Sequence, residues 1–252
     1  MAVGGRAVLV TVLVLIASCK DPQGPECRGH AGNAGLEIDM SFESARHEMV
    51  ANQLEARGIR DERVLAAMRR VPRHEFVLER WREQAYRDRA LPIEHGQTVS
   101  QPYIVAAMSE LAALDEGAQV LEVGTGSGYQ AAVLAEMGMT VYSIEILEPL
   151  AKKAQSTLAR LGYGAVQVRH GDGYRGWPEA SPFDAILVTA AAPQVPRALL
   201  EQLSAKGRLV IPVGDWDQQL EVHTRTADGF ESRRVFPVRF VPMTGEIRDP
   251  PP

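Results

Sequence analysis

The chain has 252 residues, of which 45% are hydrophobic and 23% are charged, and its formal net charge is -5 at pH 7. This length and composition suit a globular domain with a sizeable core and an extension. The mild acidity gives no support for a nucleic-acid partner, which normally requires a basic surface, so none is predicted.

Residues 1–35 differ in composition from the rest of the chain. Arg6 is followed by an apolar run over 7–17 and then by Ser18 and Cys19. A basic start, a short apolar run and small residues are typical of a secretory signal, and this run is shorter than the roughly 20 residues that span a bilayer. The letters LIASC also resemble the lipobox of bacterial lipoproteins, which predicts export with a lipidated Cys19 as the membrane attachment. The alternatives are a disordered leader and a start codon assigned too far upstream of the true one.

Both cysteines, Cys19 and Cys27, lie in this leader. The rest of the chain is therefore predicted to lack a disulfide framework, a thiolate metal site and a cysteine nucleophile. The histidines do not follow a metal-binding spacing either, so no metal is predicted.

Residues 36–97 are predicted to form an N-terminal helical region. Apolar residues at helical spacing indicate a helix over 41–57 that ends at Gly58. A second helix is predicted to begin after Asp61, which suits an N-cap, and to end before Pro72. The stretch that follows, up to Gln97, is irregular and polar.

From residue 118 onward, short apolar strands alternate with helices. The strands are predicted over 118–124, 140–146, 165–172, 183–190 and 207–214. Apolar strands that alternate with helices indicate a parallel sheet covered on both faces. Residues 219–242 indicate two more strands joined by a turn at Asp228 and Gly229. The predicted fold class is α/β, with a doubly wound, mostly parallel sheet, an antiparallel C-terminal hairpin and an N-terminal helical cap. The sheet domain is assigned to 98–247, and 248–252 to a tail.

A glycine-rich segment, LEVGTGSGYQ, connects the first of these strands to its helix. Its glycines let the backbone turn tightly and admit a ligand to the free N–H groups where the helix begins. The dinucleotide fingerprint would place its third glycine at Tyr129, so a nicotinamide dehydrogenase is disfavoured. Glu122 precedes the first glycine by two residues and suits a ligand with an ammonium or sulfonium group better than a pyrophosphate.

Two further acidic residues lie where the next strands are predicted to end. Glu145, about 20 residues after Gly124, can accept hydrogen bonds from both hydroxyls of an unphosphorylated ribose. Asp172, in the tripeptide GDG, can accept from an adenine amino group. The alternative interpretations are a carboxylate at a helix start for Glu145 and a turn residue for Asp172. Together with Glu122, they predict one crevice at the carboxyl edge of the sheet.

The glycine loop resembles motif I of class I S-adenosylmethionine-dependent methyltransferases, which have a Rossmann-like fold. Residues 46–243 resemble the protein-L-isoaspartate O-methyltransferase family, through the segments YRDRALPIEHGQTVSQPYIVA, VLEVGTGSGYQAAVLA, GDGYRGW, PFDAILVTAAA and FVPM. The resemblance implies S-adenosyl-L-methionine as the cofactor and isoaspartyl-containing proteins and peptides as partners. The free α-carboxylate would be methylated to an ester that closes to a succinimide and partly reopens to aspartate, leaving S-adenosylhomocysteine. A monomer is expected.

The resemblance also implies site residues. The predicted cofactor-binding residues are Glu122, Gly124, Thr125, Gly126, Ser127, Gly128, Glu145, Asp172 and Gly173. The predicted substrate-binding residues are Gln97, Thr98, Val99 and Ser100, with Ser100 in the catalytic position. The chain departs from the family at Glu94 and His95, where the family has a glycine-rich turn. Its leader is also unusual in a family whose typical members are cytoplasmic, so the location stays open between export and the cytoplasm.

The role of Ser100 can be narrowed from its chemistry. The substrate carboxylate is already an anion at neutral pH, so neither an enzyme nucleophile nor a general base is needed. A serine followed by Gln-Pro before an apolar run predicts an N-cap with proline in the first turn. We therefore expect Ser100 to cap a helix and to orient the carboxylate. The alternatives are a methyltransferase acting on a small hydroxyl or a base, and a binding-only protein with an inactive site.

Overall fold

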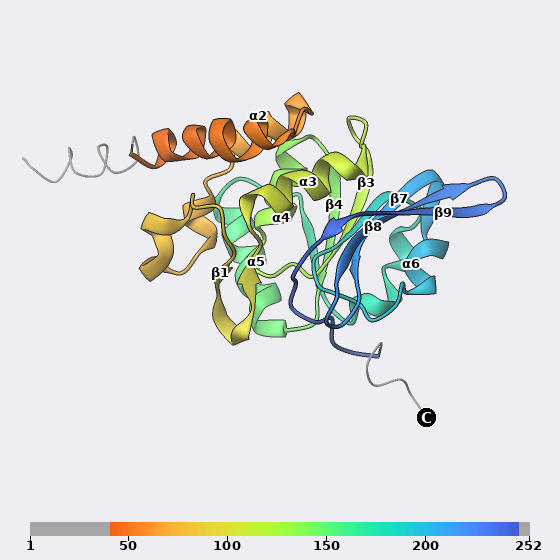
Figure 1. The fold of residues 1–252 in the computed structure, drawn as a ribbon. Coiled ribbons are helices and arrows are strands. Elements are labelled where there is room, and N and C mark those ends of the chain that lie inside the picture. The colour runs from red at the N-terminus through yellow and green to blue at the C-terminus, as the bar shows by residue number, and fades with distance from the viewer. Residues whose placement is uncertain (1–40, 247–252) are drawn as a thin grey trace, which may run out of the picture.

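A seven-stranded sheet forms the centre of the molecule, with the strand order β5-β4-β3-β6-β7-β8-β9 (Figure 1). The computed structural model describes residues 41–246, so the predicted leader with Cys19 and the tail 248–252 lie outside the described residues. The strands are β3 (Gln119–Val123), β4 (Thr140–Glu145), β5 (Gln167–His170), β6 (Phe183–Val188), β7 (Leu203–Val213), β8 (Gln219–Thr226) and β9 (Gly229–Pro237).

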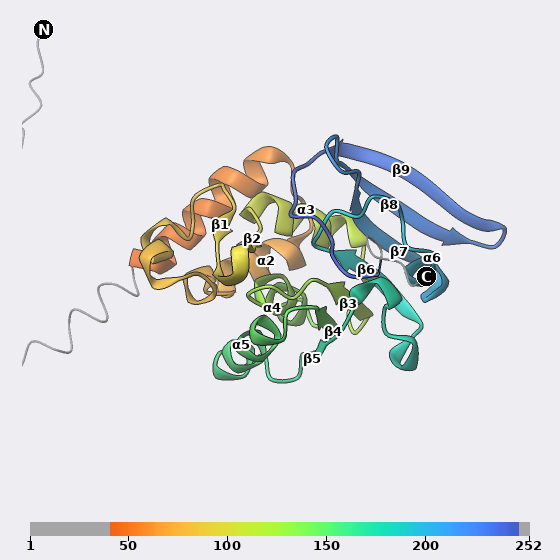
Figure 2. The same cartoon turned by 90° about the horizontal axis from the view of Figure 1, so that it is seen from below.

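The strand directions confirm the predicted fold class. Strands β3 to β7 pair in parallel, and β8 and β9 add an antiparallel hairpin at one edge. The hairpin turns at Ala227 and Asp228, one residue earlier than predicted, because Gly229 already pairs with Thr226. Both views of the ribbon place the tip of this hairpin and the N-terminal region at opposite ends of the molecule (Figure 2).

Helices and turns cover both faces of the sheet. The helices are α2 (Glu62–Arg70), α3 (Pro102–Ala112), α4 (Tyr129–Glu136), α5 (Glu148–Arg160) and α6 (Arg197–Glu201). Alternate strand residues, such as Val120 and Val141, pack in one core with buried residues of α2 to α5. Their neighbours Leu121 and Ile144 pack in a second core with Leu199 of α6. This alternation is the period of two expected for a strand buried on both faces.

The N-terminal region follows the prediction with a change of helix type. Residues 41–49 are α-helical, and the chain then widens into a π-turn (Val50–Leu54) and tightens into a 3-10 turn (Glu55–Arg57). Gly58 ends it with a φ of 97°, in the left-handed region where glycine is favoured. Asp61 caps α2, since its carboxylate accepts the backbone N–H groups of Arg63 and Val64.

The segment from Arg73 to Gln97 is irregular, as predicted, apart from the first strand of a short hairpin with two residues in each strand. It contains the 3-10 turns η3 (Arg73–Phe76), η4 (Glu79–Gln84) and η5 (Glu94–Gly96). The hairpin pairs β1 (Leu91–Pro92) with β2 (Thr98–Val99). Periodicity could not indicate this hairpin, because each strand is too short to show an alternation.

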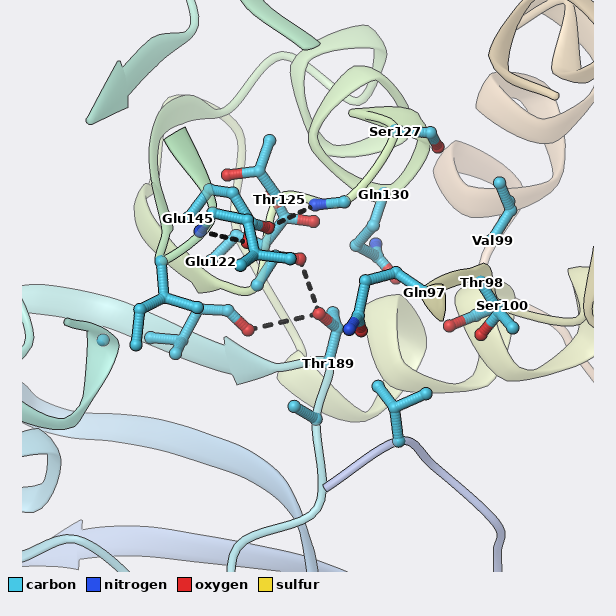
Figure 3. Close-up of a pocket in the computed structure, with 18 of the residues that line it drawn as sticks. Gln97, Thr98, Val99, Ser100, Glu122, Thr125, Ser127, Gln130, Glu145 and Thr189 are labelled. Carbon is cyan, nitrogen blue, oxygen red and sulfur yellow. Dashed lines mark hydrogen bonds between the residues drawn. The ribbon is translucent and has the colours of Figure 1, made fainter. Parts of the chain in front are cut away.

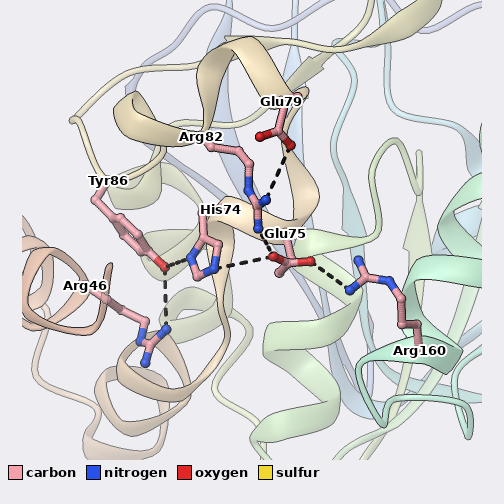
Figure 4. A network of polar contacts seen from close by, with 7 residues as sticks. All are labelled: Arg46, His74, Glu75, Glu79, Arg82, Tyr86 and Arg160. Atoms are coloured by element: carbon pink, nitrogen blue, oxygen red, sulfur yellow. Dashed lines mark hydrogen bonds and ion pairs between the residues drawn. The ribbon is translucent and has the colours of Figure 1, made fainter. Parts of the chain in front are cut away.

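A polar network fixes this region to the sheet domain (Figure 4). Glu75 accepts from Arg82 of η4 and, at 2.7 Å, from Arg160 of α5. Burial alone would raise the pKa of the Glu75 carboxyl, but the hydrogen bond and charge of Arg160 and the charge of Arg82 hold that pKa below its usual value. His74 lies 2.6 Å from the Tyr86 hydroxyl and stacks on Phe42. The helical cap is thus held by both stacking and charge.

Candidate active site

The carboxyl ends of β3, β4 and β6 border a cavity of about 260 Å³, here called the inner cavity. Strand β3 lies between β4 and β6, so the chain connections leave it in opposite directions. Such a switch point is the usual ligand site of an open α/β sheet. A single water needs only roughly 10–15 Å³ by a comparable measure, so the inner cavity has room for a ligand of many atoms.

Most of the predicted site residues meet at this inner cavity (Figure 3). Those that line it are Gln97, Thr98, Val99, Ser100, Glu122, Gly124, Thr125, Gly126, Ser127, Glu145 and Gly173. Among the predicted residues, Gly128 and Asp172 do not line it. Gly128 is the N-cap of α4, and a side chain there would meet Leu158 at 3.2 Å.

Asp172 makes contacts other than the one predicted. Its carboxylate accepts the backbone N–H groups of Tyr174, at 2.9 Å, and Glu246, at 2.8 Å. It therefore caps the turn that follows β5 and holds the C-terminal segment, while Gly173 beside it lines the inner cavity. Sequence alone did not show that residue 246 returns to this strand end.

Two glycines at the strand ends, Gly124 of the glycine loop and Gly173 after β5, pack too closely to carry a side chain. Gly124 has a φ of 98°, and a Cβ atom there would lie 2.5 Å from the Thr189 hydroxyl oxygen. That hydroxyl donates to the Gly124 carbonyl at 2.6 Å. At Gly173, a Cβ atom would lie 2.3 Å from a Val123 methyl carbon. The side chains of Thr189 and Val123 therefore fill the space beside these two glycines, and no other residue type fits there.

Glu145, at the end of β4, is held in a fixed position. Its Oε2 accepts the Gly126 N–H at 2.8 Å, and its Oε1 accepts the Leu147 N–H at 3.0 Å. The residue is only 5% exposed. Each carboxylate oxygen can accept a second hydrogen bond, so Glu145 retains capacity for two hydroxyl donors.

Glu122 is completely buried behind the glycine loop. Its Oε2 accepts from the Ser143 hydroxyl, which lies 2.6 Å from the Thr125 hydroxyl. Its Oε1 has no hydrogen-bond partner within residues 41–246. Burial raises the pKa of the Glu122 carboxyl to about 8, so the protonated form predominates at pH 7. A cationic donor in the cavity would satisfy Oε1 and favour the ionised carboxylate.

Replacing Glu122 by glutamine should flatten the pH dependence of stability. The folded protein holds a proton that the unfolded chain releases between the ordinary pKa of 4.5 and about 8. The free energy of unfolding should therefore fall as pH rises through this window, by up to about 1.4 kcal/mol per pH unit, and level off above it. Urea unfolding from mildly acidic to mildly alkaline pH measures this slope. Parallel profiles for the two proteins would contradict the buried, protonated carboxyl.

Ser100 is not the helix cap that the sequence predicted. Helix α3 begins at Pro102, and its N-cap is Gln101, which makes no side-chain cap hydrogen bond. Proline has no N–H and forces the preceding residue to be extended, so Gln101 takes the cap position and Ser100 lies one residue too early. The Ser100 hydroxyl has no hydrogen-bond partner among the described residues, and it lines the inner cavity.

The turn before Ser100 is kept in place although it has Glu94 and His95 where the family has a glycine-rich turn. His95 has a φ of 55°, an uncommon value for a residue with a side chain, and it lines the inner cavity. The Ile93 N–H donates to the Gln97 carbonyl at 2.9 Å, which closes the turn. Glu94 pairs with Lys153 of α5, and this hydrogen bond lowers the pKa of the Glu94 carboxyl.

Several lining residues were not predicted. They are Val105, Val123, Gln130, Ile146, Leu147 and the segment 241–244, together with His95 and Tyr129, for which no site role was predicted. Tyr129 lies against Arg73, whose guanidinium carbon is 4.8 Å from the ring centroid. Burial lowers the pKa of the completely buried Arg73, whose Nε donates to the Ala85 carbonyl at 2.7 Å. The FVPM segment contributed to the family resemblance, but no site role was predicted for it. In the structure, the Met243 N–H donates to the Ala191 carbonyl beside the cavity.

A second hollow, here called the outer groove, adjoins the inner cavity and encloses about 450 Å³. Its lining residues come from the N-terminal region, from α3 and from the chain around the end of β9. They are Arg57, Ala90, Thr98, Ser100, Gln101, Tyr103, Ile104, Thr189, Phe236, Pro237, Val238, Arg239, Phe240 and Val241. Four of them also line the inner cavity: Thr98, Ser100, Thr189 and Val241. Ser100 therefore lies where the two spaces meet.

Residues 41–246 lack two features that could have indicated other functions, a metal site and a membrane-spanning helix. No group of three or more His, Cys, Asp or Glu side chains there is arranged to hold a metal ion. No helix in that part of the chain is long and apolar enough to cross a membrane.

The parallel sheet, the glycine loop and the carboxylate on the next strand define an S-adenosylmethionine-dependent methyltransferase fold. A solved protein-L-isoaspartate O-methyltransferase has a TM-score of 0.74 at 30% identity, and the match covers 80% of this chain and 67% of that one. The family model for protein-L-isoaspartate(D-aspartate) O-methyltransferase matches residues 44–248. The chain belongs to this family.

Further relatives agree with this assignment. A protein-L-isoaspartate O-methyltransferase of Gloeobacter violaceus is 58% identical over 200 residues, which is 79% of this chain and 98% of the relative. One from an Anaeromyxobacter species is 48% identical over 240 residues, 94% of this chain and 97% of the relative. A Plasmodium falciparum structure, solved in complex with S-adenosyl-L-homocysteine, has a TM-score of 0.69 at 28% identity and covers 79% of this chain and 98% of that one. The predicted family, enzyme activity and cofactor are confirmed.

Proposed function

We propose that S-adenosylmethionine binds in the inner cavity, that the isoaspartyl segment binds in the outer groove, and that Ser100 orients the α-carboxylate between them. The observation that carries this assignment is the position of Ser100 on the lining of both spaces. Its hydroxyl has no partner among the described residues and is therefore available to a ligand.

The residues of the inner cavity fit the cofactor group by group. Glu145 has acceptor capacity for the ribose hydroxyls, and Ile146 and Leu147 beside it offer apolar surface for the base. The unpartnered Oε1 of Glu122 suits an ammonium donor. When bound, S-adenosylmethionine supplies a methyl group on a sulfonium, which a carboxylate oxygen can take without any proton transfer.

Ser100 then has a positioning task. The α-carboxylate is ionised at neutral pH, so the protein has to align it and does not have to activate it. A hydroxyl donor at the junction can hold one carboxylate oxygen while the other faces the inner cavity. The short hairpin of β1 and β2 fixes this position, because Leu91 pairs with Val99 directly before Ser100.

The activity on peptides tests the assignment. The purified chain, incubated with radiolabelled S-adenosylmethionine, should label an isoaspartyl peptide and leave its aspartyl twin unlabelled. An isoaspartyl peptide with its α-carboxylate amidated is the matched control and should also stay unlabelled. Equal labelling of the aspartyl twin would contradict the assignment. Calorimetric binding of S-adenosylhomocysteine without labelling of any peptide would indicate the binding-only alternative.

A further inference from the structure

The outer groove is positively charged although the chain carries a net charge of -5. Its lining includes Arg57 and Arg239 and no aspartate or glutamate. Asp88 pairs with Arg57 at 2.8 Å and compensates that charge. No carboxylate of residues 41–246 pairs with Arg239. Arg239 therefore contributes the uncompensated positive charge of the groove.

The backbone on both sides of Arg239 is fixed. Gln218 accepts the Val238 N–H on its backbone carbonyl at 3.0 Å. Its side chain accepts the Phe240 N–H at 2.6 Å and donates to the Phe240 carbonyl at 3.2 Å. The exposed Arg239 side chain therefore starts from a defined position at the groove, which limits the entropy it loses when it pairs.

The groove is also lined by an aromatic pair and by the compensated arginine. The Arg57 guanidinium lies 3.5 Å from the centroid of the Tyr103 ring, and Tyr103 lies 6.1 Å from Phe236. An extended peptide in the groove would thus meet both aromatic surface and the unpaired guanidinium of Arg239. A guanidinium binds carboxylates in a planar, two-pronged geometry and keeps its charge at every physiological pH.

We propose that Arg239 makes the outer groove select isoaspartyl segments in which an acidic residue flanks the isoaspartyl residue. The proposal rests on the assignment of the groove to the peptide and adds the charge of the preferred substrate. A flanking carboxylate would pair with Arg239, and a flanking lysine would be repelled by it. This attraction acts over a short range around Arg239, because dissolved salt screens the charges of exposed groups.

The test uses three isoaspartyl peptides that differ only in carrying Glu, Gln or Lys as the neighbours of the isoaspartyl residue. The wild type should show a kcat/KM for the Glu peptide about 3- to 5-fold above that for the Gln peptide at low salt, in the upper part of the range for an exposed ion pair. In Arg239→Gln this ratio should fall to about one, because the charge is gone. The control Arg233→Gln removes an exposed arginine of β9 that does not line the groove, and it should keep the wild-type ratio.

Three outcomes would overturn the inference. The ratio of kcat/KM between the Glu and Gln peptides could be one in the wild type, or it could be unchanged in Arg239→Gln. It could also fall equally in Arg233→Gln, which would mean that the summed charge of β9, and not Arg239 alone, sets the preference. An equal loss on all three peptides in Arg239→Gln would instead place Arg239 on the isoaspartyl carboxylate itself, and this too overturns a flanking preference.

A binding measurement separates this inference from the proposed function. Fluorescence anisotropy of labelled Glu and Gln peptides, with S-adenosylhomocysteine present, reports groove affinity without turnover. Preferential binding of the Glu peptide that depends on Arg239, with no methylation of any peptide, would overturn the proposed function and support the inference. Methylation without any such preference would overturn the inference alone.

Discussion

Replacing Glu145 by alanine is expected to weaken S-adenosylhomocysteine binding about 10- to 150-fold, the range for losing a hydrogen bond to a charged group. The structure adds a second reason for this loss. The Glu145 carboxylate also holds the backbone of Gly126 and Leu147, so its removal releases the glycine loop as well as the ligand hydroxyls. Isothermal titration calorimetry measures the affinity directly and does not depend on the peptide substrate.

A pair of variants separates the two contributions. Glu145→Gln keeps one carbonyl acceptor and most of the side-chain volume, so it should lose less affinity than Glu145→Ala. The matched control is Glu201→Ala, which removes an exposed carboxylate on α6 that does not line the inner cavity. The control should bind like the wild type. Unchanged affinity in Glu145→Ala, with the fold intact in a thermal melt, would remove Glu145 from the proposed cofactor site.

The sheet could be predicted because its determinants are local. The runs around β3, β4 and β6 are mostly apolar without a strict alternation, and the helices between them have their own spacing, so a parallel sheet with two covered faces follows. A parallel sheet brings the carboxyl ends of its strands to one edge. This rule predicted one crevice bordered by Glu122, Glu145 and Asp172. Glu122 and Glu145 line the inner cavity, and Asp172 lies directly beside the lining residue Gly173.

The incorrect or missing predictions concern contacts between distant segments. Asp172 was expected to border the cavity, but it does not line it; its carboxylate accepts the N–H of Glu246, and no local pattern indicates that contact. In the sequence, Tyr129 was noted only because it stands where the dinucleotide fingerprint has its third glycine. Its contact with the buried Arg73 could not be predicted, because Arg73 comes from the distant N-terminal region. The outer groove combines residues from Arg57 to Val241, so it exists only in the folded chain.

Glu122 shows a different limit of sequence reasoning. Its type and position indicated a partner for a positive group, and the structure leaves one of its oxygens unsatisfied, as such a role requires. The sequence could not show that complete burial would raise its pKa to about 8. The protonated form of the carboxyl is therefore favoured at pH 7, and a bound cation would favour its ionised form.

Replacing Ser100 by alanine is expected to lower kcat/KM for isoaspartyl peptide about 10- to 100-fold, because one donor to a charged carboxylate is lost. The affinity for S-adenosylhomocysteine should stay nearly unchanged, since Glu145 and the glycine loop are untouched. Stability should also stay within about 0.5 kcal/mol, because Ser100 makes no cap hydrogen bond that could be lost. This last result would differ from that of a serine at the N-cap, whose loss typically costs about 1 kcal/mol.

Replacing Ser100 by aspartate should be more damaging than alanine. An aspartate at the junction would meet the substrate carboxylate at close range, and two like charges about 4 Å apart repel by about 4 kcal/mol at an effective dielectric constant of 20. The activity should fall by a further factor of about ten or more, and added salt should recover little of it, because the two charges would lie closer than the Debye length. The control Ser156→Asp adds the same charge on the exposed face of α5 and should be as active as the wild type. If Ser100→Asp is more active than Ser100→Ala at saturating cofactor, the carboxylate does not bind at this position and Ser100 does not orient it.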